Sequence, residues 1–149
     1  MNRVSFKGVI IGGVVDIVAT YIGAIPVGVY AFMVAGLSNV PQAQQAQALT
    51  DVMRNRPSVY LAGILVGAVC SVLGGYIAAR IAKHDELLNG ALSSFLCVAT
   101  GLFALARGTP GTAPWVHILL IVISPLLGAI GAWLRLRGKN ASTGAAAPA

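Results

Sequence analysis

Charge is scarce in this sequence, and acidic residues are the scarcest. Of the 149 residues only 9% are charged, with 10 Lys or Arg against 4 Asp or Glu, whereas soluble domains carry about 25% charged residues. Hydrophobic residues make up 57% of the chain, and the mean hydropathy is +0.83. The lack of charge excludes an ordinary soluble domain and predicts an integral membrane protein.

Residues that carry catalysis or bind metals are also few. The 2 cysteines, Cys70 and Cys97, form no C-x-x-C motif, and we interpret them as small apolar core residues. His84 and His117 are expected at opposite membrane surfaces, too far apart to share a metal ion or a haem. No serine lies in a nucleophile elbow, and no phosphate-binding loop is present. The sequence therefore predicts no catalytic residue, no metal site and no cofactor.

Four apolar runs are long enough to cross a hydrocarbon core about 30 Å thick, which takes about 20 helical residues. They cover residues 6–36, 58–83, 86–107 and 115–137. We expect residues 1–137 to form an all-α transmembrane domain, with the four helices in an antiparallel bundle. The first run is too long for a cleaved signal peptide, so this helix is expected to remain.

Two polar segments lie outside these runs. The loop 37–57 is Gln-rich, and two alternatives are open for it: a short helix on the membrane surface beginning near Pro41, or a disordered loop. The C-terminal segment 138–149 contains only small and polar residues apart from Lys139, and it is expected to be a disordered tail.

Basic residues flank the apolar runs, which makes them determinants of topology. No basic helix is interleaved with exposed aromatic residues, so no nucleic-acid partner is expected. Trp115 and Trp133, about 27 Å apart on the fourth helix, fit two interfacial anchors, with packing residues as the alternative. The excess of basic residues on one side predicts that both termini are cytoplasmic. The two sides carry Arg3, Lys7, Arg80, Lys83, Arg135, Arg137 and Lys139 against Arg54, Arg56 and Arg107.

A tight turn must join the second and third helices, because few residues separate them. Asp85 is expected to cap the third helix, since a side-chain oxygen at that position accepts a free backbone N–H of the first turn. Glu86 adds negative charge that favours the same helix end. The two helices are therefore predicted to form a hairpin.

Small residues recur every four positions along the predicted helices. In lipid no hydrophobic force draws helices together, so close approach at small residues and interhelical hydrogen bonds must do so. We therefore predict close packing of the four helices along small-residue stripes, with self-association through the same faces as the alternative. The glycines expected at these contacts are Gly8, Gly12, Gly28, Gly63, Gly67, Gly75 and Gly128.

Asp16 is an acid well inside the first apolar run. An acid near the centre of a membrane helix costs about 2.5–3.5 kcal/mol on insertion scales, so it needs a partner or a function. From matched depths along the helices, we hypothesise that hydroxyls of Ser71, Tyr76 or Ser93 hold it, together with the Arg80 guanidinium. Such partners would make Asp16 a buried structural element.

The alternative is that Asp16 is a proton or cation site, because intramembrane acids often mark ion pathways. Against this stands the absence of a second acid or a buried histidine to continue a relay. We weigh the structural interpretation above the transport one.

Two segments resemble a group of known proteins. GGYIAARIAKHDELLNGAL, Gly74 to Leu92, resembles the hairpin of small, mostly uncharacterised bacterial four-helix membrane proteins, and VIIGGVVDI, Val9 to Ile17, resembles their opening helix. The resemblance implies a multi-pass protein of the bacterial cytoplasmic (inner) membrane, and it supplies no catalytic residues.

The sequence thus predicts a non-catalytic structural or accessory component of the bacterial inner membrane. Its expected partners are the lipid bilayer and either a further copy of the chain or another membrane protein. The alternative function is a small proton- or cation-coupled transporter or channel that uses Asp16.

Overall fold

The computed structural model describes residues 4–107 and 114–144, which are helical apart from short connections and contain no strand. The elements are α1 (Phe6–Val34), a 3₁₀ turn η1 (Leu37–Asn39), α2 (Gln42–Asn55), α3 (Pro57–Ala82), α4 (Glu86–Ser93), α5 (Phe95–Arg107) and α6 (Pro114–Gly144). Four segments are long and apolar enough to cross a membrane: Phe6–Val34, Pro57–Ala82, Glu86–Arg107 and Ile118–Lys139. The prediction of an all-α protein with four candidate spans is confirmed.

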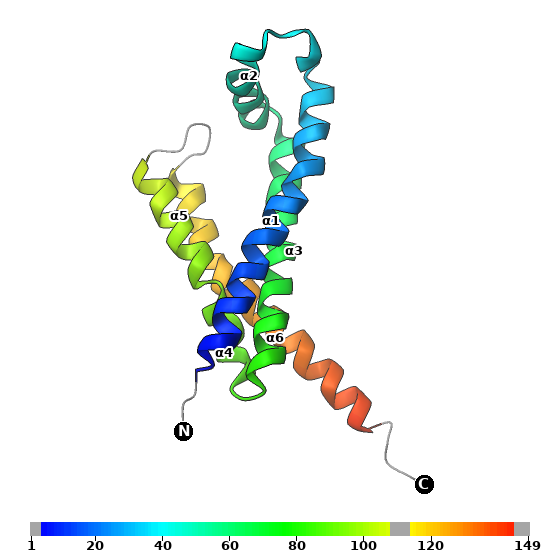
Figure 1. Cartoon of the computed structure of the whole chain (residues 1–149), viewed down its shortest axis with the longest axis vertical. Coiled ribbons are helices and arrows are strands. Elements are labelled where there is room, and N and C mark those ends of the chain that lie inside the picture. Colours follow the sequence, from blue (N-terminus) through cyan, green and yellow to red (C-terminus); the bar gives the residue numbers. More distant parts are fainter. Residues whose placement is uncertain (1–3, 108–113, 145–149) are drawn as a thin grey trace.

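The long helices form two arms that diverge from a common base (Figure 1). Helices α1 and α3 pack side by side as one arm, with α2 at its upper end, and α5 lies beside the first part of α6 as the other. At the base, α4 packs against α6 and α3, and the last part of α6 projects beyond the other helices. The start of α1 and the end of α6 both lie toward this lower end.

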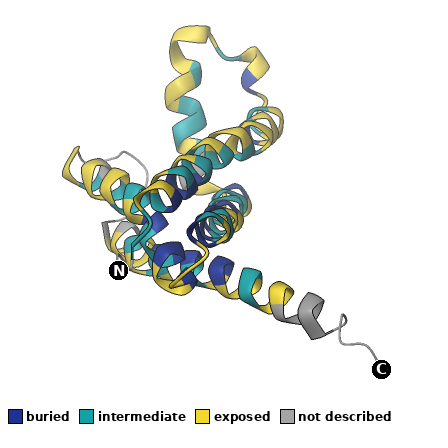
Figure 2. Cartoon of the chain, turned by 60° about the horizontal axis from the view of Figure 1, so that its bottom comes forward, coloured by how far each residue is buried: buried dark blue, intermediate teal, exposed yellow. Residues whose placement is uncertain are grey.

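Buried residues concentrate at the base, where α1, α3, α4 and α6 meet (Figure 2). The outer faces carry large exposed apolar side chains such as Tyr21 and Phe95. Trp115 and Trp133 are 67% and 47% exposed, which fits anchors at a membrane surface better than packing residues.

The structure decides one open alternative and departs from two expectations. The segment 37–57, for which a helix and a disordered loop were both open, contains helix α2. Helix α6 continues to Gly144. The described part of 138–149 is therefore helical and not disordered, and residues 145–149 lie outside the described residues.

The helix expected at residues 86–107 is broken at Ser94 into α4 and α5. The Ser94 hydroxyl donates to the Ser124 carbonyl oxygen of α6 at 2.9 Å, and the Ser93 hydroxyl donates to the Gly90 carbonyl oxygen at 2.7 Å. Serine hydroxyls that bond nearby carbonyls compete with the helical pattern and bend helices. The Ser94 N–H accordingly bonds Ala91, three residues back, at 3.3 Å. The chain therefore changes direction between α4 and α5.

Glycines set the separation of the helices at the base. A Cβ added to Gly12 would lie 2.7 Å from the Gly74 carbonyl oxygen, and one added to Gly74 would lie 2.8 Å from the Gly12 carbonyl oxygen. Gly75 is packed just as closely against α6, since a Cβ added to it would lie 2.6 Å from the Gly128 Cα. Real Cβ contacts are longer than this, so any side chain at these positions would force the helices apart.

The predicted packing glycines divide into two groups. Besides Gly12, Gly75 and Gly128, Gly8 is tightly packed, with an added Cβ only 2.9 Å from the Ala78 carbonyl oxygen. A Cβ on Gly28, Gly63 or Gly67 would meet nothing within 4 Å. In this second group Gly28 lies on α1, and Gly63 and Gly67 lie on the first half of α3, where no neighbouring helix comes close to them.

Alanine substitution should separate the two groups. We expect Gly75→Ala to lower the thermal midpoint of the protein in detergent, because the Gly128 backbone leaves no room for a methyl group. Gly67→Ala, on the same helix, should leave the midpoint unchanged or raise it, since alanine is the better helix former by about 1 kcal/mol. Thermal unfolding followed by circular dichroism measures both, and equal losses would contradict the observed packing.

Candidate functional site

Asp16 lies at a junction of three helices. It is on α1 and only 1% exposed. The Ser71 hydroxyl of α3 donates to Asp16 Oδ1 at 3.2 Å, and the Cys97 thiol of α5 donates to Oδ2 at 3.0 Å. Each carboxylate oxygen is thus bonded to a different helix, and one side chain connects α1, α3 and α5.

The glycines next to Asp16 make this junction possible. A Cβ on Gly74 would lie 2.7 Å from the Asp16 Cβ, so only a residue without a side chain lets α3 come this close. Ser71 precedes Gly74 by three positions and therefore lies on the same face of α3. The small-residue pattern brings the hydroxyl within hydrogen-bond distance of the acid.

Of the partners predicted for Asp16, the structure brings only Ser71 to it. The Ser93 side chain is buried, but its hydroxyl donates to Gly90. Among the described residues, neither Tyr76 nor Arg80 donates a hydrogen bond to Asp16, and Arg80 is exposed.

The reason is the direction in which each side chain leaves α3. At about 100° per residue, Tyr76 is turned about 140° from Ser71 and Arg80 about 180°. Arg80 is also about 13 Å further along the helix axis. The sequence-based hypothesis grouped these residues because they lie at similar depths along the helices. Depth does not determine which face of α3 a side chain occupies.

Cys97 is the partner that sequence reasoning missed. A thiol is counted as a small apolar group with a weak S–H donor, so Cys97 was assigned to the core. A signal was present, because Cys97 lies four residues after Ser93, on the face that carries small residues. Cys70 is a buried free cysteine, and Cys97 is a half-buried one.

Among the residues whose side chains the structure describes, no Lys, Arg or His forms an ion pair with Asp16. The ion pair described among them is between Lys139 and Glu86, at 3.7 Å. No cluster of three or more His, Cys, Asp or Glu side chains suited to a metal occurs in the described part of the chain. The hydroxyl of Ser71 and the thiol of Cys97 are the donors that hold the acid.

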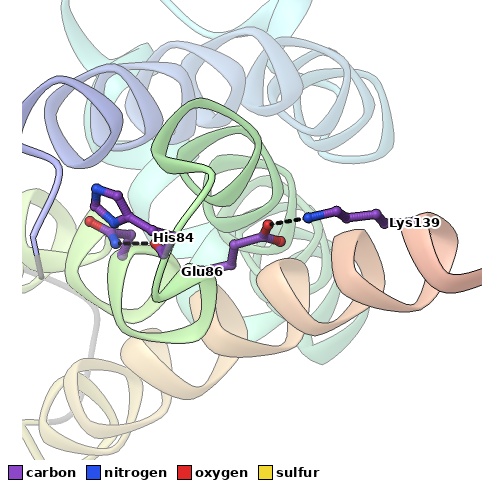
Figure 3. Close-up of polar contacts among 4 residues, drawn as sticks. His84, Glu86 and Lys139 are labelled. Atoms are coloured by element: carbon purple, nitrogen blue, oxygen red, sulfur yellow. Dashed lines mark hydrogen bonds and ion pairs between the residues drawn. The ribbon is translucent and has the colours of Figure 1, made fainter.

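A second buried polar residue, Asn89 of α4, holds the turn between α3 and α4. Its amide nitrogen donates to the carbonyl oxygens of His84 and Asp85, both at 3.0 Å. Its amide oxygen accepts from the Ser5 N–H at 2.7 Å. Figure 3 shows His84 in this turn beside Glu86 and Lys139. Asn89 therefore fixes the turn and the start of α1 together.

The expected cap by Asp85 is absent. Asp85 precedes α4, but its side chain makes no capping hydrogen bond, and its φ of 40° and ψ of 47° lie in the left-handed region. N-cap residues normally have extended backbone angles, which aim the side chain at the free N–H groups. The Asn89 amide donates to carbonyl oxygens of this turn and therefore does not replace the cap, which would accept from N–H groups of α4.

Comparison of the chain with protein-family models, with curated proteins and with solved structures gave no match. The resemblance to small bacterial four-helix membrane proteins therefore remains an expectation from the sequence.

The hydrogen bonds to Asp16 predict an order of effects on stability. We expect Ser71→Ala and Cys97→Ala each to lower the free energy of unfolding in detergent by about 1 kcal/mol, the scale of interhelical hydrogen bonds in membrane proteins. Arg80→Gln is the control and should have no effect, since its side chain is exposed. Denaturant titration measures all three, and a loss in Arg80→Gln equal to the others would show that the guanidinium supports the site.

Asn89→Ala should be more damaging than either change, because the His84 carbonyl oxygen and the Ser5 N–H lose the Asn89 side chain as partner. The Asp85 carbonyl oxygen keeps only the backbone N–H of residue 89. Each buried group left unsatisfied costs about 1–3 kcal/mol. Asn39→Ala, at an exposed position of η1, is the matched control. Limited proteolysis between α3 and α4 would report opening of the turn, and unchanged cleavage would contradict the assigned role.

Proposed function

We propose that the protein is a non-catalytic, multi-pass component of the bacterial inner membrane, with a structural or accessory role. The observation that carries the proposal is the Asp16 junction. A buried carboxylate bonded to α3 and α5 holds these helices to α1. The described residues contain no cluster of three or more His, Cys, Asp or Glu side chains that could hold a metal ion.

The membrane arrangement belongs to the same proposal. We take the four spans to cross the bilayer in alternating directions as an antiparallel bundle, with both termini cytoplasmic because basic residues are in excess at those ends. The small-residue stripes supply the contacts, as the tight positions at Gly12, Gly75 and Gly128 support. The stripe positions Gly28, Gly63 and Gly67, open within one chain, leave a face for a second copy or another membrane protein.

One observation favours a second candidate, a proton- or cation-coupled transporter or channel. An acid paired with Arg or Lys already has its charge balanced. Asp16 has a hydroxyl and a thiol as partners and no such pair within the described residues. An intramembrane acid of this kind is a functional site by default.

Flux measurements decide between the two functions. The full-length protein is reconstituted into liposomes that contain a pH-sensitive dye, and a proton gradient is imposed. We expect wild type to be no more permeable than protein-free liposomes, because the structural role requires no pathway. Repeating the assay with Na⁺ and K⁺ gradients extends the test to cations.

Substitutions of Asp16, with matched substitutions of Asp51 as controls, decide how the result is interpreted. The structural proposal would be overturned if wild type conducted and a folded Asp16→Asn variant did not. In that case Asp51→Asn, at an exposed position of α2, should still conduct. An inert wild type, together with a lower thermal midpoint of Asp16→Ala than of Asp51→Ala, would support the structural proposal.

A further inference from the structure

Basic residues lie at the end of α3 and along the last part of α6, which projects beyond the other helices (Figure 1). This basic surface consists of Arg80, Lys83, Arg135, Arg137 and Lys139. Arg80 and Lys83 belong to the end of α3, and the other three lie within two turns of α6. Four of the five are exposed, and Arg135 is half-buried.

The acids at this end do not neutralise the surface. Glu86 is buried and pairs with Lys139, which joins the start of α4 to α6. Asp85 is exposed. Within the described residues no ion pair involves Arg80, Lys83 or Arg137. An excess of exposed positive charge therefore remains.

The helices hold the two parts of the basic surface in a fixed relation. An added Cβ on Gly131 of α6 would lie 2.7 Å from the Tyr76 nitrogen of α3, so the two helices touch just before the basic residues begin. One turn beyond Arg135, the ion pair between Lys139 and Glu86 joins α6 to the start of α4.

An aromatic contact places the surface at headgroup depth. The Arg137 guanidinium carbon lies 5.2 Å from the centre of the Trp133 ring, and this ring is on the exposed side of α6. Tryptophan concentrates at the boundary between hydrocarbon and water. The candidate spans end at Ala82 and Lys139, so all five basic residues lie within about two turns of a span end.

Arg135 adds a donor without an acceptor. Its Nε is buried and has no hydrogen-bond partner within the described part of the chain. Guanidinium groups bind phosphate oxygens through paired N–H donors, more strongly than neutral acceptors. The buried Nε would have to turn outward to donate to a phosphate group next to α6.

We propose that the basic surface binds the headgroups of anionic phospholipids. Clustered Lys and Arg at the cytoplasmic ends of spans attract negatively charged lipid, and the attraction weakens with ionic strength. The bound lipid lies with its chains along the exposed apolar side of α6 and its phosphate between α6 and the end of α3. This inference does not depend on the role of Asp16.

Lipid binding to the full-length protein in detergent tests the proposal. Phosphatidylglycerol is titrated against phosphatidylcholine, and native mass spectrometry counts the bound lipids. We expect preferential binding of phosphatidylglycerol that falls as ammonium acetate is raised. Equal binding of the two lipids, or no dependence on salt, would overturn the proposal without any variant.

Matched double variants then locate the site. Arg80→Gln/Arg137→Gln should weaken phosphatidylglycerol binding by more than fivefold, since each Lys or Arg near the surface contributes about 1 kcal/mol. Arg56→Gln/Arg107→Gln removes the same charge from exposed positions at the other ends of the helices and should have little effect. An equal loss in both would mean that total charge alone attracts lipid, which would overturn a local site.

Competition with inorganic phosphate distinguishes a site for lipid from a site for soluble phosphate. If millimolar phosphate displaced phosphatidylglycerol more strongly than sulfate at equal ionic strength, the surface would be a site for soluble phosphate and the proposal would be wrong. Displacement that depends only on ionic strength supports the lipid as the ligand.

Discussion

Close approach of backbones at glycine is the constraint on which the rest of the structure depends. Where Gly12 faces Gly74 and Gly75 faces Gly128, no side chain separates the helices. In lipid, attraction between helices comes from close van der Waals contact and hydrogen bonds. The short separation of α1 from α3 also brings Ser71 within reach of Asp16. Packing and polar contacts therefore have the same origin.

The sequence predicted the helices well because their length and apolarity are set by the thickness of the bilayer. It predicted poorly what depends on direction around a helix axis. The contact between Asp16 and Ser71 was predicted correctly. Arg80 lies on α3 like Ser71, but its side chain leaves the opposite side of that helix. At the break, the Ser94 hydroxyl bonds a carbonyl oxygen of α6, and no local pattern reveals this contact. Asn89 bonds a backbone group 84 positions away, and such a contact leaves no periodic signal.

Polar side chains inside the structure serve different purposes at two levels. Near the base, Asn89 bonds backbone groups of a turn, where the helical pattern leaves carbonyl oxygens free. Deeper in the helices, Asp16 bonds side chains of two other helices. The Asn89 side chain satisfies backbone groups of the turn between α3 and α4. The Asp16 side chain joins helices in which the backbone groups already bond one another.

The Cys97 thiol is 81 positions after Asp16 in the chain, and the Ser71 hydroxyl is 55 after it. Proteins are synthesised from the N-terminus, and their first segments begin to fold before later ones exist. The first helix therefore carries its acid at a time when neither donor has been made. The Ser71 hydroxyl becomes available to Asp16 when α3 has been made, and the Cys97 thiol only when α5 follows. The order of synthesis therefore lets this junction close only after α5 has been made, and the contacts of α6 with α3 and α4 form later still.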